Sequence, residues 1–232
     1  MQKIGLLEKQ KENKMVQSKA WNWEMVAPDD EYWNTPDPEI YYLAQNWKNK
    51  GYKKFLDIGC GLGRNALYLA KQGFCVTTFD LSEKSVEVVK QKFEDNNLVL
   101  DDIKVCDMLE MNYPENSFDC ILAMNVISHT DTQGFKEILE KIRKMLKPGG
   151  EVFFTLGSKQ SYWYNREDLP VVDECTKIRI EDGPENGIPH FYVNDEDCLR
   201  LFTDFKIVNL RHVSELTSYG SFSPHYYVWL RK

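Results

Sequence analysis

Short apolar runs and longer amphipathic stretches alternate along most of this 232-residue chain. Seven runs have the length and apolar content of buried strands, and they lie at residues 55–58, 74–79, 103–108, 117–124, 151–156, 205–210 and 226–230. Four stretches carry apolar residues at helical spacing, at 38–50, 64–70, 82–93 and 135–145. Alternation of this kind predicts a parallel sheet with helices on both faces.

The helix signals and the last two apolar runs refine this prediction. Asp37 followed by Pro38 is a typical helix start, and Gly51 can end that helix. No helical stripe separates the last two runs, so we expect them to pair as an antiparallel ribbon. The predicted fold class is α/β: a doubly wound, mostly parallel seven-stranded sheet with helices on both faces and an antiparallel last strand.

Two segments lie outside this regular pattern. Residues 1–36 open with a charged stretch, expected to be helical around 8–14, and then become rich in aromatic side chains: Trp21, Trp23, Tyr32 and Trp33. Residues 158–194 form a long connection in which Thr176–Ile180 alternates with the period of a strand. We expect an N-terminal aromatic arm or lid (1–36) and a single domain (37–232), whose inserted segment 158–194 roofs a pocket at the sheet's carboxyl edge.

Composition limits the classes of function. The hydrophobic fraction is 42%, so disorder is not expected, and the formal net charge of −7 argues against a nucleic-acid partner. No apolar run reaches the length of a membrane span, and the first residues lack the apolar core of a secretion signal. The six cysteines form no Cys-x-x-Cys pair, so we expect reduced thiols and no metal site. These features predict a cytoplasmic protein with no membrane partner. They do not decide between a monomer and a homodimer.

The most specific motif is the turn after the first predicted strand, Asp57-Ile58-Gly59-Cys60-Gly61-Leu62-Gly63-Arg64-Asn65. An acidic strand end, a glycine-rich turn and a helix start form the layout of a nucleotide-type cofactor site. Glycines allow close approach of a ligand and left-handed backbone dihedrals. A dinucleotide fingerprint would have its third glycine where Arg64 stands. A tight structural turn is the simpler alternative.

Further polar residues follow the other predicted strands. Asp80 ends the second strand about 20 residues beyond the turn, where an acid can accept hydrogen bonds from ribose hydroxyls. Its alternative role is a helix N-cap, although Ser82 fits that role at least as well. Asp107 and Met108 end the third strand, and Asn125 follows the fourth.

Taken in this order, the motifs resemble those of class I S-adenosylmethionine-dependent methyltransferases over about residues 52–157. The resemblance implies a Rossmann-like fold, S-adenosylmethionine as cofactor and S-adenosylhomocysteine as product. The implied cofactor contacts are Asp57 near the donor's amino group, Gly59, Cys60, Gly61, Gly63 and Asn65 in the turn, Asp80 and Leu81 at the ribose, Asp107 and Met108 at the adenine, and Asn125 near the sulfonium. Tyr32 and Trp33 are the best lid candidates, because a sulfonium favours aromatic faces.

Residues 63–70 are similar to the tellurite-resistance and thiopurine branches of this family, which implies methyl transfer to a small-molecule acceptor by in-line displacement. An oxygen or nitrogen acceptor can need a general base. His190, His129 and His225 are the candidate catalytic residues, since each is expected near the cofactor edge or the roof. A lone histidine is more often a structural hydrogen-bonding residue, and His212 is expected to be only a strand residue.

Three other functions stay open at this point. A protein or RNA methyltransferase would show a basic stripe or an open cleft. A non-catalytic S-adenosylmethionine-binding protein would have its acceptor side filled by Tyr162, Trp163 or Phe191. A nicotinamide dehydrogenase is disfavoured by Arg64 at the third glycine position.

Overall fold

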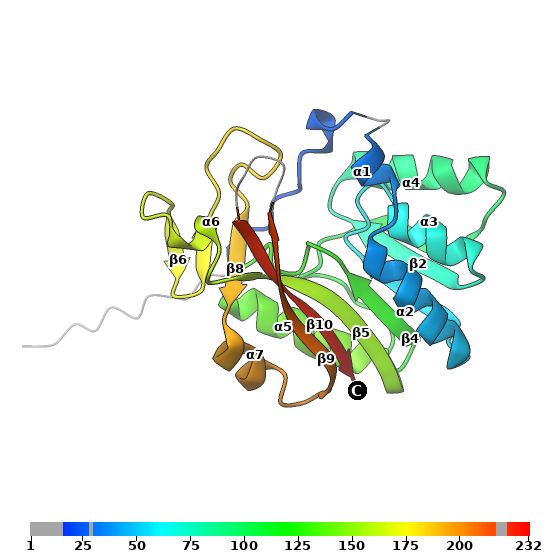
Figure 1. Ribbon diagram of the computed structural model, residues 1–232. Coiled ribbons are helices and arrows are strands. Elements are labelled where there is room, and N and C mark those ends of the chain that lie inside the picture. The colour runs from blue at the N-terminus through cyan, green and yellow to red at the C-terminus, as the bar shows by residue number, and fades with distance from the viewer. Residues whose placement is uncertain (1–15, 28–29, 217–221) are drawn as a thin grey trace, which may run out of the picture.

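The computed structural model describes residues 16–27, 30–216 and 222–232, so the predicted helix around 8–14 lies outside the described residues. The strands are β1 (Lys54–Ile58), β2 (Cys75–Asp80), β3 (Leu100–Val105), β4 (Phe118–Ala123), β5 (Leu146–Ser158), β6 (Val171–Asp173), β7 (Thr176–Ile178), β8 (Pro189–Val193), β9 (Lys206–Leu216) and β10 (Phe222–Arg231). The helices are η1 (Trp23–Met25), α1 (Glu31–Asn34), α2 (Pro38–Asn49), α3 (Arg64–Lys71), α4 (Glu83–Asp95), α5 (Thr132–Met145), α6 (Tyr162–Asn165) and α7 (Asp195–Leu201). Figure 1 shows the sheet with helices packed around it.

The seven predicted strands all form, in the spatial order β3-β2-β1-β4-β5-β10-β9. The third strand was predicted too late in the sequence: β3 ends at Val105, so Asp107 and Met108 lie in the loop after it. Strands β1 to β5 pair in parallel, and β10 runs antiparallel to both β5 and β9. This confirms the predicted fold class, including the antiparallel last strand.

The sheet also has three short strands that the count of seven did not include. Strands β6, β7 and β8 come from residues 158–194, and β7 covers part of the run expected to alternate. The pairing of β4 with β5 ends at Phe154, whereas β5 continues to Ser158. Strand β8 pairs in parallel with Gly157 and Ser158 of this extension. The roof is therefore joined to the sheet just beyond the end of β4.

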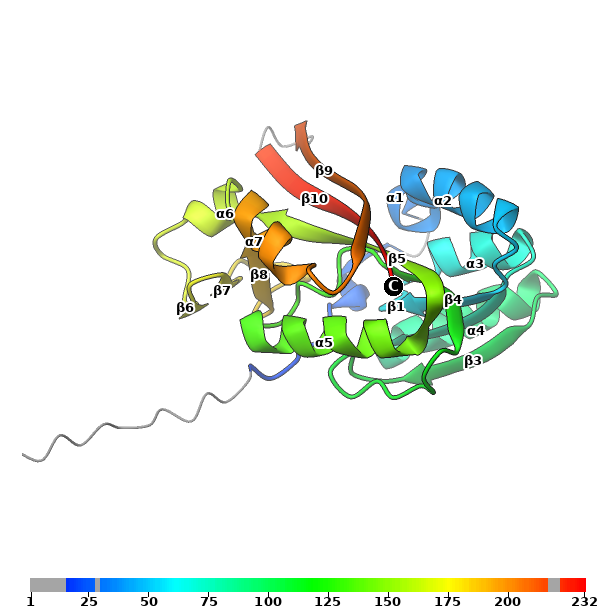
Figure 2. The same cartoon turned by 90° about the horizontal axis from the view of Figure 1, so that it is seen from below.

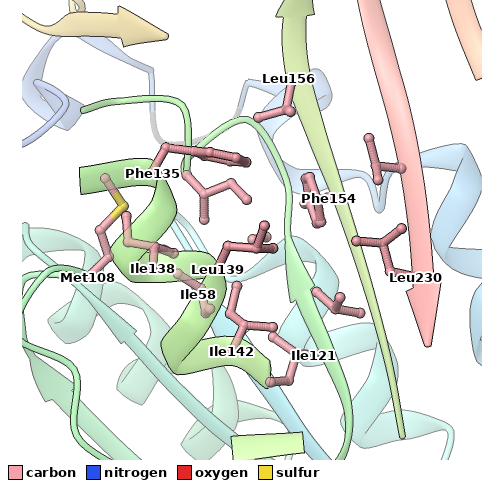
Figure 3. Close-up of a cluster of buried hydrophobic side chains, with 14 of the residues drawn as sticks. Ile58, Met108, Ile121, Phe135, Ile138, Leu139, Ile142, Phe154, Leu156 and Leu230 are labelled. Atoms are coloured by element: carbon pink, nitrogen blue, oxygen red, sulfur yellow. The ribbon is translucent and has the colours of Figure 1, made fainter. Parts of the chain in front are cut away.

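Both faces of the sheet are buried, because successive residues of β4 enter different cores. Ile121 and Ala123 belong to the core that α5 covers, while Cys120 and Leu122 belong to the core with α2, α3 and α4. Figure 2 shows α5 on one side of the sheet and α2 and α3 on the other. Figure 3 shows the predicted stripe of α5, with Phe135, Ile138, Leu139 and Ile142, directed at the strands.

The helix starts are as the sequence indicated. The Asp37 carboxylate accepts a hydrogen bond from the Glu39 N–H at 3.0 Å, with Pro38 as the first helical residue. Ser82 caps α4 through the Ser85 N–H at 3.3 Å. No helix among the described residues has the length and apolar content needed to cross a bilayer.

A buried carboxylate outside the cavity joins α2 to the antiparallel side of the sheet. Glu151 of β5 is 0% exposed and accepts hydrogen bonds from the indole N–H groups of Trp47 and Trp229, both at 3.1 Å. Lys50 and Arg231 bind the same carboxylate at 2.7 Å. Four donors, two from α2 and its C-cap and two from β10, thus compensate the desolvation of one charge.

We expect Glu151→Gln to lower the free energy of unfolding by about 2–4 kcal/mol, because the amide cannot satisfy two cations and two indole donors at once. Urea denaturation measures this change. The control is Glu140→Gln, which removes a carboxylate from an exposed pair with Lys144 and should leave the urea midpoint unchanged. Equal midpoints for both variants would contradict the structural role of Glu151.

Candidate active site

A cavity of about 360 Å³ lies at the carboxyl edge of the parallel strands, between the strand ends, the arm and the roof. Most residues predicted to bind the cofactor or act in catalysis line it: Trp33, Asp57, Gly59, Cys60, Gly61, Asn65, Asp80, Leu81, Asp107, Met108, Asn125, His129, His190 and His225. Two predicted cofactor contacts, Tyr32 and Gly63, do not line it. The volume is in the range of ordinary small-ligand sites.

The glycine turn has the left-handed backbone that the sequence predicted. Gly59 has φ 65° and Gly61 has φ 53°, values that other residues adopt at a cost. A Cβ on Gly59 would lie 2.3 Å from Val126 and one on Gly61 would lie 2.5 Å from the ring of Trp23. The absence of a Cβ at Gly59 and Gly61 therefore makes room for two side chains of the protein itself, Val126 and Trp23.

Gly63 has a structural position. It is the N-cap of α3, with φ 78°, and a Cβ there would lie 2.7 Å from Val89 of α4. Its glycine lets α3 pack against α4, which explains why it is part of the motif although it does not face the cavity.

Two buried acids, Asp57 and Asp80, stand at the ends of neighbouring strands. Asp80 accepts hydrogen bonds from the Gly61 N–H at 2.8 Å and the Ser82 N–H at 2.9 Å, so its carboxylate fixes the turn, while Ser82 is the helix cap. Asp57 is 2% exposed, and its Oδ2 has no hydrogen-bond partner among the described residues. Burial, and then the nearby Asp80, raise the pKa of Asp57 to about 8, against an opposing effect of Arg64.

The loops that follow β3 and β4 complete this side of the cavity. Asp107 accepts a hydrogen bond from the Leu109 N–H at 2.8 Å and lines the cavity beside the buried Met108. Asn125 has φ 54°, and its side-chain oxygen accepts a hydrogen bond from the Thr155 hydroxyl at 2.7 Å. That bond fixes the loop after β4 to β5.

The aromatic arm covers the glycine turn with Trp21, Trp23 and Trp33, whose rings pack with centroids 4.3–5.2 Å apart. All three line the cavity. Tyr32, by contrast, is 60% exposed and packs its ring on Arg64 and Trp33. The Arg64 guanidinium also donates a hydrogen bond to the Tyr32 carbonyl at 2.7 Å, so the residue in the third glycine position of a dinucleotide motif anchors the arm.

The arm and the roof meet over the cavity. The Asn22 N–H donates to the Pro184 carbonyl at 3.0 Å, and the Lys19 ammonium donates to the Asn186 carbonyl. Figure 1 shows the blue arm running between the yellow roof and α1. Lys19 lines the cavity, and so does Glu185, which lies between Pro184 and Asn186 in the sequence. The two contacts between the arm and the roof therefore close one side of the cavity.

Two of the three candidate bases come together with an acid that the sequence analysis did not single out. The rings of His129 and His190 have centroids 4.6 Å apart, and Glu185 Oε1 lies 3.5 Å from His190 Nε2. Burial, and then His190, lower the pKa of His129 to about 3, so this imidazole is neutral at physiological pH. Burial alone would raise the pKa of Glu185, but His190, His129 and Arg179 hold that pKa below its usual range. Glu185 ends the acidic run Glu181-Asp182-Gly183-Pro184-Glu185, and this local sequence alone does not indicate a functional site.

His225 of β10 lines the same cavity, whereas His212 of β9 stacks on Tyr226 outside it, as expected for a strand residue. Of the residues proposed to fill the acceptor side, Tyr162 is 56% exposed outside the lining, while Phe191 lines the cavity and packs its ring on Phe135 of the core. Trp163 lines the cavity, with the Arg179 guanidinium 3.3 Å from its ring centroid.

Comparison with known proteins agrees with this geometry. A family model described as a methyltransferase domain matches residues 55–150. A phosphoethanolamine N-methyltransferase from Plasmodium falciparum is 31% identical over 185 residues, covering 68% of this chain and 69% of the relative. A ubiquinone biosynthesis O-methyltransferase from Histophilus somni is 31% identical, covering 67% of this chain and 65% of the relative.

Solved structures show the same fold. An S-adenosylmethionine-dependent methyltransferase from Methanosarcina mazei aligns with a TM-score of 0.68 at 20% identity, over 85% of this chain and 98% of its own. TehB from Haemophilus influenzae aligns with a TM-score of 0.63 at 20% identity, over 84% of this chain and 62% of its own. The chain therefore belongs to the class I S-adenosylmethionine-dependent methyltransferases, and S-adenosylmethionine is its cofactor.

The unpartnered Oδ2 and raised pKa of Asp57 predict that the binding of a ligand with an ammonium group at this carboxyl depends on pH. Below about pH 8 the ligand-free Asp57 holds a proton, and binding of an ammonium favours the carboxylate and releases that proton. We expect the affinity for S-adenosylhomocysteine to rise by up to about tenfold per pH unit from pH 6 to pH 8 and then to level off. Calorimetric titration at several pH values measures this slope, which Asp57→Asn should abolish. The same slope in both proteins would exclude Asp57 as its source.

Proposed function

We propose that this methyltransferase transfers the methyl group to a heteroatom of a small-molecule acceptor that binds beneath the arm and the roof. The observation that carries this proposal is the closure of the cavity by the Asn22–Pro184 and Lys19–Asn186 contacts. A nucleic acid or a folded protein needs an open face, and the net charge of −7 offers no general attraction for a phosphate backbone. The relatives' names specify phosphoethanolamine and ubiquinone biosynthesis, which are also small-molecule chemistry.

The donor binds at the ends of β1, β2 and β3 in this proposal. Asp57 accepts hydrogen bonds from the amino group, Asp80 from the ribose, and Asp107 from the adenine amino group, with Met108 against the ring. Asp80 accepts backbone hydrogen bonds from Gly61 and Ser82, with Leu81 as a further backbone partner, and a carboxylate has about four acceptor positions, so capacity remains for a ribose hydroxyl. Trp21, Trp23 and Trp33 shield the donor from water and replace Tyr32 as the lid residues.

The acceptor binds where the loop after β4, the roof and β10 contribute polar side chains: His129, His190, Glu185 and His225. When bound, the cofactor supplies a methyl group already activated by a positive sulfur, which departs as a neutral thioether when the acceptor's lone pair bonds to carbon. The chain's residues align the acceptor, exclude water and take up the proton that an O–H or N–H acceptor loses. His225 and His190 are the candidate proton acceptors on this side of the cavity, whereas the lowered pKa of His129 makes that imidazole a poor base.

Asp80→Asn should weaken S-adenosylhomocysteine binding by about tenfold or more, because hydrogen bonds to a charged, buried carboxylate contribute about 1.5–3 kcal/mol each. The matched control is Asp101→Asn on the exposed face of β3, which should bind with the affinity of the unchanged protein. Calorimetry gives both affinities, and thermal unfolding checks that the variants are folded. Wild-type affinity in a folded Asp80→Asn variant would remove the ribose role.

The acceptor class is tested with S-adenosylmethionine that carries a radioactive methyl group, incubated with the enzyme and a cell extract. Separation into low-mass, RNA and protein fractions then locates the label. We expect label in the low-mass fraction with the unchanged enzyme and none with Asp57→Asn. Label that appears with the RNA or the protein would show that the acceptor is a macromolecule.

A further inference from the structure

Three potential metal ligands converge on one point of the cavity wall. His129 follows β4, whereas Glu185 and His190 both belong to the roof (158–194), with His190 in β8, so they come from two segments of the chain. One nitrogen or oxygen of each lies within 4.8 Å of those of the other two, and all three residues line the cavity. His190 Nε2 and Glu185 Oε1 are 3.5 Å apart.

Other groups orient two of these side chains. His190 Nδ1 lies 3.1 Å from the Ile188 carbonyl, an acceptor that favours the neutral tautomer with Nδ1–H, in which Nε2 is the metal-binding nitrogen. Glu185 Oε2 lies 3.0 Å from Arg179 Nη1, which leaves Oε1 directed at His190. A backbone carbonyl behind an imidazole and a hydrogen-bond donor behind a carboxylate are the usual outer partners of metal ligands.

An ion pair accounts for only part of this arrangement. One carboxylate can pair with one imidazolium, whereas two imidazole rings lie here with centroids 4.6 Å apart. The ring of His129 makes no hydrogen bond to any residue in the described ranges. Two cationic rings at this distance would repel each other, while a cation between two neutral rings and a carboxylate satisfies all three groups.

We propose that His129, Glu185 and His190 bind a divalent transition-metal ion of the zinc class. Two imidazoles and one carboxylate form the donor set of catalytic zinc sites that keep an open position. Neighbouring ligands of a tetrahedral zinc ion lie roughly 3.3 Å apart, which the His190–Glu185 pair nearly meets. The cysteine spacing implied no metal, and His129 lies far from Glu185 and His190 in the sequence, so no local motif marks this site.

The open position of the ion would face the cavity and take the heteroatom of the acceptor, a role that rests on the proposed function. A bound hydroxyl or thiol then loses its proton more readily and keeps its lone pair for the methyl group. The nitrogens that bind the metal cannot also accept the acceptor's proton. His225 of β10 lines the same cavity, and in this proposal it accepts that proton and passes it to solvent.

Zinc titration of the full chain, free of any affinity tag, tests the site. Cys75, an exposed thiol, is changed to Ser in every sample so that it cannot bind the metal. The ligand variants are His129→Ala, His190→Ala and Glu185→Gln, and the control is His212→Ala, which removes an exposed imidazole outside the cavity. Calorimetry gives the affinity and stoichiometry, and the visible absorption of Co²⁺ reports ligand number and geometry. S-adenosylhomocysteine is titrated into the same samples.

We expect one zinc ion per chain, an affinity at least about tenfold lower in each ligand variant, and no change in His212→Ala. Retained S-adenosylhomocysteine binding shows that a variant is folded. Equal zinc affinity in the ligand variants and the control would overturn the proposal, as would the absence of zinc binding in a protein that binds S-adenosylhomocysteine. If the folded Cys75→Ser background protein does not bind S-adenosylhomocysteine, that result contradicts the cofactor site. The zinc titration of the same protein tests the metal site independently.

Discussion

Parallel pairing of β1, β2, β3 and β4 is the constraint on which the rest of the molecule depends, because it brings the carboxyl ends of four strands to one edge. Side chains that are far apart in the sequence, Asp57, Asp80, Asp107 and Asn125, become neighbours at that edge. Burial of both sheet faces fixes the register, since a slip of one residue in β4 would exchange Ile121 and Leu122 between the two cores. Packing energy thus holds the polar site in place.

The two ends of the cavity differ in how their charges are compensated. At the donor end, Asp57 is buried with an unpartnered oxygen, so its carboxylate becomes stable only when a cationic ligand arrives. At the acceptor end, Glu185 is already paired with the Arg179 guanidinium, which stabilises its charge without a ligand. The donor end is therefore prepared for an ammonium group. The acceptor end can hold a further cation only if the imidazoles are neutral, as burial makes His129.

Local sequence signals predicted the parts of the molecule that depend on local chemistry. The seven strands, the start of α2 at Asp37 and Pro38, and the positive φ of the glycine turn follow from periodicity, capping and the absence of a Cβ. Contacts between distant segments could not be read this way. The packing of Gly63 on Val89, the exposure of Tyr32, the strand β8 and the four donors around Glu151 all depend on which segments meet in space. The role of Glu185 could not be predicted for the same reason, because it depends on a contact with His129, which lies in the loop after β4.

The most direct test of the account is a crystal structure with S-adenosylhomocysteine bound. The account predicts the ligand's amino group within hydrogen-bond distance of Asp57 Oδ2, its ribose hydroxyls at Asp80, and its sulfur directed toward the space between Asn125 and the histidines. Trp21, Trp23 and Trp33 should cover it, with the Asn22–Pro184 contact in place. A ligand that left Asp57 Oδ2 without a partner, or that bound outside the strand ends, would contradict the central claim that this sheet edge is built around the methyl donor.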